Sequence, residues 1–252
     1  MSRLIINKSV VCALLLLCAS SGWAEDPTVT NSANGTNNTA TTNASFGFTA
    51  TAGRLLVVTV GSDDYKTGDP SGYTLSTGMS QQTFLGSYLW WKIAAGGETS
   101  VSYTIGSASP SAWTVTEFNN IDATPYDTSN GQLTASGATT YTTPTITPST
   151  GRRLVLAVIG GSRNPPAITD LTTWLNSYTE VNQSFNNSGA TGDITGISML
   201  VMDGNGSTST SSGATYSTTP DARTAHIISF KVASGGGGGG AASKLMLMGV
   251  GP

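Results

Sequence analysis

The chain contains an internal repeat. The stretch from Thr41 to Val60 aligns without a gap with the stretch from Thr139 to Val158, at a constant offset of 98 residues. The similarity resumes downstream, where GSYLWWKI from Gly86 corresponds to GISMLVMD from Gly196. A repeat of about a hundred residues that consists of short β-branched and aromatic runs predicts two copies of one sheet module.

Each copy is a series of short strand-like runs separated by Gly, Pro and Asn turns, without the long 3.6-residue periodicity of helices. We therefore expect an all-β fold, an antiparallel, jelly-roll-like β-sandwich made of two sequence-related halves, about 41–121 and 139–232. The continuously apolar run 54–60 is typical of a strand buried on both faces or central in a sheet. Because the joining segment is short and lacks linker composition, one intertwined sandwich is favoured over two tandem domains.

The N-terminus has the organisation of a secretory signal peptide, residues 1–24. Arg3 and Lys8 precede a short apolar run, and Ala24 precedes the expected cleavage point. Both cysteines, Cys12 and Cys18, lie inside this segment, so the expected mature chain has no thiol. The apolar run is too short to span a bilayer. We expect a secreted or cell-surface protein with a bacterial-type signal and no transmembrane segment.

Three further segments flank the expected β-sandwich, 44–233. Residues 25–43 are polar and form either a flexible leader or a first edge strand. Residues 234–242 include six consecutive glycines and are typical of a flexible linker. Residues 243–252 are a short apolar C-terminal tail, which either docks on a partner or is a frayed end.

The expected mature chain carries little charge. Charged residues are 10% of the sequence, and loss of Arg3 and Lys8 leaves nine basic against fourteen acidic residues, a formal charge of −5. A weakly acidic, charge-poor surface argues against nucleic acid as a partner. Ser, Thr, Asn and Gly supply the solubility, as is common in extracellular sheet proteins.

The sequence offers no set of catalytic residues. His226 is the only histidine, so neither a Ser-His-Asp triad nor a zinc site is indicated, and a structural or half-exposed strand residue is its simplest interpretation. A glycosidase needs two opposed carboxylates. Asp63, Asp64, Glu98 and Glu117 are candidates, but nothing in the sequence pairs them, and Glu117 is expected at a solvent-facing strand position. We predict that the protein is not an enzyme.

One loop has the composition of a calcium site. Asp63, Asp64 and Asp69 place three carboxylates within seven residues. Calcium takes oxygen ligands from such loops, so a structural calcium ion is the one cofactor that the sequence suggests. The spacing is not that of an EF-hand, and an ordinary polar loop is the alternative.

Aromatic residues suggest a ligand-binding face. In the run from Tyr88 to Ile93, alternate side chains point to opposite faces of a sheet, so Leu89 and every second residue after it are expected in the core. Tyr88, Trp90 and Lys92 share the other face, where a Tyr and a Trp could form a platform for sugars. The alternative is that a second sheet or a loop covers Trp90, because large aromatics are usually well buried.

The order of motifs resembles a known kind of module. It is carried by Arg54-Leu-Leu-Val-Val-Thr-Val, Gly72-Tyr-Thr-Leu, Tyr88-Leu-Trp-Trp-Lys-Ile, Ser102-Tyr-Thr-Ile and Phe118-Asn-Asn-Ile. This pattern is similar to an uncharacterised duplicated β-sandwich module of secreted bacterial and phage surface proteins. The resemblance covers about 44–232 and implies a jelly-roll or lectin-like sandwich that serves as an accessory or surface part. It brings no catalytic residues, and Tyr73 replaces the tryptophan usual in the module.

Three functions are compatible with these observations. The first is a non-enzymatic secreted surface protein, an adhesion or glycan- or matrix-binding β-sandwich. The second is a structural subunit of an extracellular filament, coat or virion-like assembly, in which the tail 243–252 docks on neighbouring copies. The third is a polysaccharide-active enzyme, whose mark would be two carboxylates converging in one groove.

Overall fold

The structure, a computed structural model, describes residues 25–62, 64–76, 86–106, 109–135, 138–164, 170–188 and 192–234. These residues form sixteen β-strands, which pair antiparallel, and no helix, so the predicted all-β sandwich fold is confirmed. The expected signal peptide, most of the glycine linker and the apolar tail lie outside the described residues.

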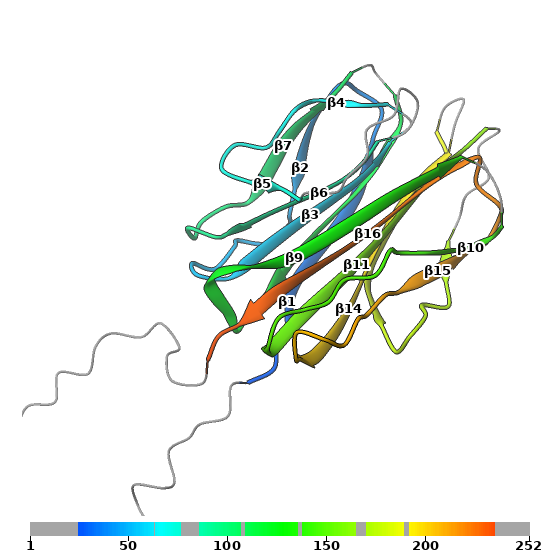
Figure 1. Cartoon of the computed structure of the whole chain (residues 1–252). Coiled ribbons are helices and arrows are strands. Elements are labelled where there is room, and N and C mark those ends of the chain that lie inside the picture. Colours follow the sequence, from blue (N-terminus) through cyan, green and yellow to red (C-terminus); the bar gives the residue numbers. More distant parts are fainter. Residues whose placement is uncertain are drawn as a thin grey trace, which may run out of the picture.

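The first half of the chain forms two sheets (Figure 1). A five-stranded sheet, the first inner sheet, has the order β1-β8-β3-β6-β5, and a three-stranded sheet, the first outer sheet, has the order β2-β7-β4. The strands are β1 (Val29–Asn37), β2 (Thr41–Ser45), β3 (Leu55–Ser62), β4 (Lys66–Gly68), β5 (Thr74–Leu75), β6 (Gly86–Ile93), β7 (Ser100–Ile105) and β8 (Ser111–Phe118).

The second half repeats this topology. The second inner sheet has the order β13-β14-β11-β16-β9, and the second outer sheet has the order β10-β15-β12. Adding eight to each label of the first half gives the order of the second half, so the repeat in the sequence is a duplication of one eight-stranded unit. The strands are β9 (Ile121–Ala135), β10 (Thr140–Thr142), β11 (Gly151–Arg163), β12 (Leu171–Thr172), β13 (Thr179–Asn186), β14 (Gly192–Gly204), β15 (Gly213–Tyr216) and β16 (Ala222–Val232).

Each half closes its own sandwich. The order β1-β8-β3-β6 opposite β2-β7-β4 is that of a jelly roll, with β5 extending the inner sheet. Among the described residues, every strand pairs within its own half, which differs from the single intertwined sandwich that was expected. The reason is that the joining segment is itself a strand, β9, which pairs with β16. Residues 29–37, inside the expected leader or edge strand, form the edge strand β1.

The four sheets stack in the order outer, inner, inner, outer. One cluster of buried side chains lies inside the first sandwich, and two lie inside the second. A further cluster lies between the two inner sheets and combines Leu55 and Leu89 of the first half with Leu154 and Ile228 of the second. Figure 1 shows the two halves side by side along this interface. Inner strands are therefore covered on both faces, which explains why all eight residues of β3 are buried.

The equivalence of the two halves shifts by one residue inside the strands. Gly53 and Gly151, which are 98 apart, both adopt a positive φ, of 82° and 115°. Beyond them, Leu55 and Leu154, which are 99 apart, both face the opposite half. A one-residue slip moves every side chain of a strand to the other face. The gap-free alignment is therefore wrong by one residue from Arg153 onward.

One edge of the interface between the halves is closed by side chains rather than by a backbone ladder. We call this edge, where β1 runs beside β13, the ladder seam, because its side-chain hydrogen bonds repeat at every second residue. Alternate residues of β13 donate hydrogen bonds to alternate carbonyls of β1. These are Asn182 to Ala33 at 2.9 Å, Ser184 to Gly35 at 2.8 Å and Asn186 to Asn37 at 3.0 Å.

Candidate functional site

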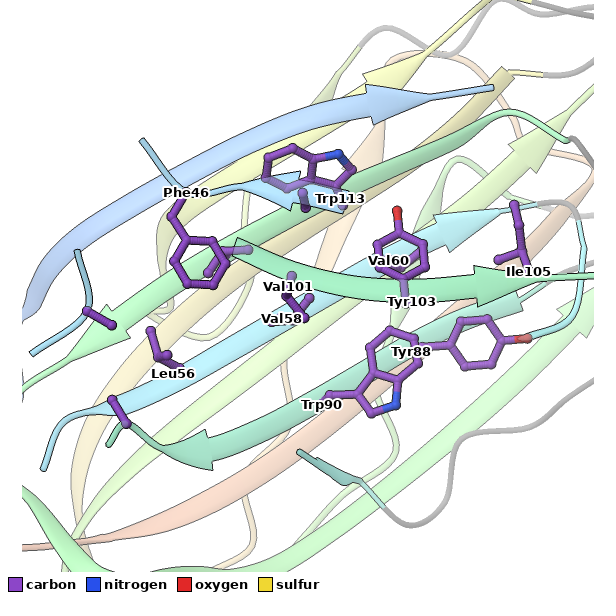
Figure 2. Packing of buried hydrophobic residues seen from close by; sticks show 14 residues of the cluster. Phe46, Leu56, Val58, Val60, Tyr88, Trp90, Val101, Tyr103, Ile105 and Trp113 are labelled. Carbon is purple, nitrogen blue, oxygen red and sulfur yellow. The ribbon is translucent and has the colours of Figure 1, made fainter. Parts of the chain in front are cut away.

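The predicted platform lies inside the first sandwich and is not exposed. Tyr88 and Trp90 are both 0% exposed. The Trp90 ring stacks on those of Tyr88 and Tyr103, at centroid distances of 5.3 and 5.9 Å. Figure 2 shows these rings together among the aliphatic side chains of the cluster. The prediction of a ligand platform at Tyr88 and Trp90 is wrong, because β7 of the outer sheet covers this face.

Lys92, the third residue of the predicted platform, is engaged at the edge of the same sandwich. Its Nζ pairs with Glu98 at 2.6 Å and lies 5.0 Å from the centroid of the Tyr73 ring. Partial burial raises the pKa of Glu98, but hydrogen bonds from Lys92 and from the Ala95 N–H outweigh it and lower the pKa to about 2. Lys92 therefore serves the local structure.

The acidic loop supports the sandwich. Asp69 accepts hydrogen bonds from the Trp90 indole N–H at 2.8 Å and from Lys66 Nζ at 3.0 Å. Asp64 accepts the backbone N–H of Tyr65 at 2.7 Å. Asp63 lies outside the described residues. Within the part of the chain that is described, no three His, Cys, Asp or Glu side chains come close enough to hold a metal ion. Asp69 instead satisfies an indole N–H in the core.

Glu117 is buried, which corrects the expectation of a solvent-facing position. Its side chain is 0% exposed and accepts hydrogen bonds from Arg54 at 2.7 Å, from Thr30 Oγ1 at 2.6 Å and from the Thr51 N–H at 2.7 Å. Burial raises the pKa of Glu117, and these hydrogen bonds reverse that effect and hold it below its ordinary value. A carboxylate held in this way is a structural anion.

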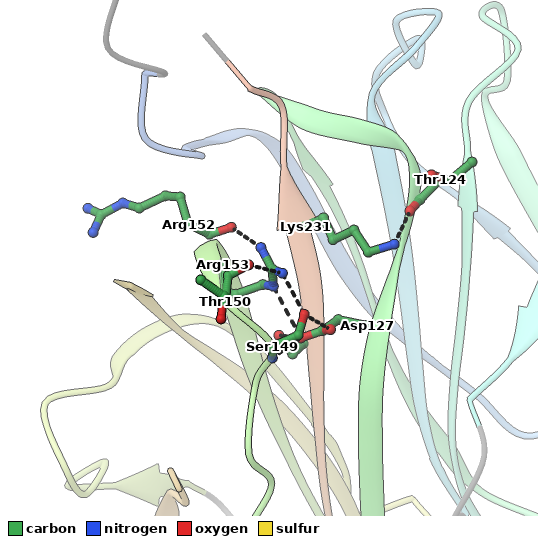
Figure 3. A network of polar contacts seen from close by, with 8 residues as sticks. Thr124, Asp127, Ser149, Thr150, Arg152, Arg153 and Lys231 are labelled. Carbon is green, nitrogen blue, oxygen red and sulfur yellow. Dashed lines mark hydrogen bonds and ion pairs between the residues drawn. The ribbon is translucent and has the colours of Figure 1, made fainter. Parts of the chain in front are cut away.

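A second buried ionic network lies in the other sandwich (Figure 3). Asp127 of β9 faces Arg153 Nε at 3.2 Å, the Ser149 N–H at 3.1 Å and Ser229 Oγ at 3.0 Å. The two side chains of the ion pair are only 8% and 7% exposed. Glu117 and Asp127 thus belong to different sandwiches, each paired with its own arginine, and do not converge in one groove.

The single histidine lies between the two halves. His226 is 1% exposed, and its Nε2 is 2.6 Å from Oγ of Ser76, which is 2% exposed. Burial lowers the pKa of His226 to about 4. No carboxylate contacts this pair among the described hydrogen bonds, so the geometry is that of a buried polar contact across the interface.

The described residues include a concave feature that sequence reasoning did not single out. A shallow hollow of about 290 Å³ is lined by Ser45, Gly47, Phe48, Thr49 and Thr99. The Phe48 ring is partly exposed, and its centroid lies 5.2 Å from that of Phe46, which is buried in the first sandwich. The sequence did not show that one of these two rings reaches the surface.

The hollow adjoins a flat polar surface, the outer face of β2 and β7. The residues on this face, all exposed except the half-buried Thr104, form three cross-strand pairs without a charged side chain. They are Thr41 with Thr104, Asn43 with Ser102 and Ser45 with Ser100. Hydroxyl and amide groups beside a partly exposed ring can form hydrogen bonds and a stacking contact with the same ligand.

Helices long and apolar enough to cross a membrane are not found among the described residues. Comparison of the chain with protein-family models, with curated proteins and with solved structures finds no match.

Proposed function

We propose that this protein is a non-enzymatic secreted surface protein that attaches to glycans through the first outer sheet, with the hollow at Phe48 as the contact point. The observation that supports this is the partly exposed Phe48 ring, which is anchored on Phe46 and bordered by the hydroxyls of Ser45, Thr49 and Thr99. A sugar presents an apolar C–H face to an aromatic ring and hydroxyls to polar neighbours. Both kinds of contact are available here.

The size and charge of the hollow limit the kinds of sugar that it can bind. A hollow of about 290 Å³ is at the lower end of small-ligand sites, which favours a terminal sugar over a long chain. Its lining carries no charged side chain, and the neighbouring residue in sequence, Glu98, is an anion. Glu98 is already paired with Lys92, so neither charge is free to serve a ligand. A neutral sugar is therefore favoured over a uronic or sialic acid, because the lining offers no cation to a carboxylate.

The experiment is a glycan array with the mature chain and two matched variants. Phe48→Ala removes the ring from the hollow, whereas Phe185→Ala removes a ring that is 45% exposed on β13 in the other half. We expect binding to neutral glycans to fall about tenfold or more with Phe48→Ala and to stay unchanged with Phe185→Ala. Equal binding by both variants would refute the assignment of the hollow.

The two alternatives have less support. Docking of the tail 243–252 concerns residues outside the described part of the chain. A polysaccharide-active enzyme needs two free carboxylates in one groove. The best buried candidates, Glu117 and Asp127, are each neutralised by an arginine in separate sandwiches.

A further inference from the structure

The interface between the halves has two edges of different strength. The ladder seam is held by side chains of β13 that bond to β1 at every second residue. At the opposite edge, which we call the His226 seam, Ser76 meets His226 and the Trp91 ring stacks on Tyr126 at 6.3 Å. In the described part of the chain, the Ser76–His226 contact is the hydrogen bond found at this edge.

Closure of the His226 seam depends on a neutral imidazole. His226 uses Nε2 toward Ser76, and its buried Nδ1 has no hydrogen-bond partner. In a neutral ring, Nδ1 is either an unpaired acceptor or an unpaired N–H donor. Burying one unpaired group of this kind costs a modest amount of folding free energy. A protonated ring has N–H groups on both nitrogens and a full charge, and a buried charge without a partner is costly. Hydration of the ring would relieve this cost, but it requires the seam to part.

No charged neighbour compensates a proton on His226. The ionisable groups of the adjacent strands are Arg223 and Lys231 on β16, Arg152, Arg153 and Arg163 on β11, and Asp122, Tyr126 and Asp127 on β9. Burial is the cause of the lowered pKa of His226, and none of these groups contributes to it.

The acidic groups on the other strands near the seam also lie far from His226 or point away from it. In the first half, Glu117 pairs in register with Leu56, whose side chain points into the first sandwich rather than toward His226. Asp193 of β14 pairs with Ser162, four residues along β11 from the partner of His226, or roughly 13 Å along the strand.

We propose that the Ser76–His226 contact is an acid-sensitive latch: protonation of His226 opens the His226 seam, and the two halves turn apart about the ladder seam. The proton comes from solvent and binds the ring nitrogen that carries no hydrogen, so that both nitrogens become N–H groups. Solvent water then replaces Ser76 and the interior as the environment of the ring. The ladder seam stays closed because its Asn and Ser donors do not titrate.

The expected size of the effect follows from linkage. In the open state the imidazole has its ordinary pKa of 6.5, and in the closed state a pKa of about 4. Stability supplied by the neutral ring is complete above pH 6.5 and is lost as the pH falls toward 4. Between pH 7.5 and 4.5 the opening equilibrium constant should rise about 70-fold.

The test is hydrogen exchange of the mature chain across this pH range, corrected for intrinsic exchange rates, on the wild type, His226→Gln and Ser76→Ala. The backbone hydrogen bonds of β16 and β6 lie within their own sheets, so parting the halves does not break them directly, but strands that lose their packing on one face open locally more often. We therefore expect β16 and β6 to lose protection on acidification while β1 and β13 keep it. His226→Gln should remove most of the pH dependence, because Gln can accept from Ser76 and cannot take up a proton. Ser76→Ala should raise the pKa of His226, which a titration of the only imidazole in the protein measures directly by NMR.

Two results would overturn the latch. One is an unchanged pH dependence of β16 protection in His226→Gln. The other is an equal loss of protection at both seams, which would mean that acid unfolds the whole domain. The imidazole titration decides the matter if His226→Gln does not fold, because a wild-type pKa near 6.5 would contradict a ring locked between the halves.

Discussion

At Gly61 the two halves approach too closely to leave room for a Cβ atom, and replacing this glycine with alanine should loosen the interface. An added Cβ would lie 2.4 Å from the backbone carbonyl oxygen of Ile194 in the other half. A backbone atom in a central strand cannot rotate away, so the inner sheets must separate locally. Gly160, the equivalent position in the second half, would meet the hydroxyl oxygens of Ser87 at 2.7 Å and Thr224 at 2.8 Å, and these side chains can rotate.

The magnitudes follow from these contacts. Overpacking of a close-packed interior costs about 1–3 kcal/mol, and Gly61→Ala should fall at the upper end because its obstacle is rigid. For a chain of this size that corresponds to a decrease in Tm of roughly 6–12 °C. Gly160→Ala should cost about 1 kcal/mol. Gly68→Ala is the matched control, since its Cβ would sit 3.4 Å from Thr104. The control should be neutral or stabilise by about 0.4–1 kcal/mol through the unfolded chain.

Thermal and urea unfolding measure the stability of the three variants. Their free energies of unfolding are compared only where the m-values are equal. The reasoning requires the order Gly61→Ala, Gly160→Ala, Gly68→Ala, from least to most stable. If Gly61→Ala were as stable as Gly68→Ala, the halves would not pack as closely as described, and the arrangement of the inner sheets would be refuted.

Three further outcomes are expected. Asp127→Asn should cost about 3–5 kcal/mol in urea unfolding, because it leaves the buried Arg153 without its anion. Trp90→Phe should cost about 1–3 kcal/mol, since Asp69 loses the indole N–H and the core loses volume. Because the folded pKa of Glu98 is about 2, its contribution is present above pH 4.5 and is lost as the pH falls toward 2. Glu98→Gln should therefore flatten the acid limb of a stability–pH curve below pH 4.5.

The sequence was sufficient to predict the duplication and central strands such as β3, but it did not show that the joining segment is itself the strand β9. The apolar run 54–60 indicated a strand buried on both faces, and β3 is one. The repeat indicated two copies of a module, and the second half has the same strand order as the first. These features depend on local periodicity, which a single sequence records. The number of layers was not accessible, because it depends on which faces of separate sheets meet.

The prediction of a ligand platform failed for a related reason. Alternation correctly placed Tyr88 and Trp90 on one face of β6, since the two rings stack there. Alternation says which side chains share a face, but it does not say whether another sheet covers that face. Here β7 supplies Tyr103 to cover it. Phe48, a ring that is partly exposed, lies just after strand β2, where alternation gives little information.

The two ionic networks show which features the two halves of the repeat share and which features differ between them. In the first half Thr30 of the edge strand donates to Glu117 of the neighbouring strand, and in the second half Ser229 donates to Asp127 of the edge strand. The carboxylate and the hydroxyl have exchanged strands. Each sandwich still contains a buried carboxylate paired with an arginine, because the carboxylate alone would be a buried uncompensated charge. The physical requirement is a cation for that carboxylate, and either of two neighbouring strands can supply the anion. Residue-by-residue alignment of the halves, with the one-residue shift, therefore matches Arg54 with Arg153 but misses the carboxylates, which lie on strands that are not equivalent.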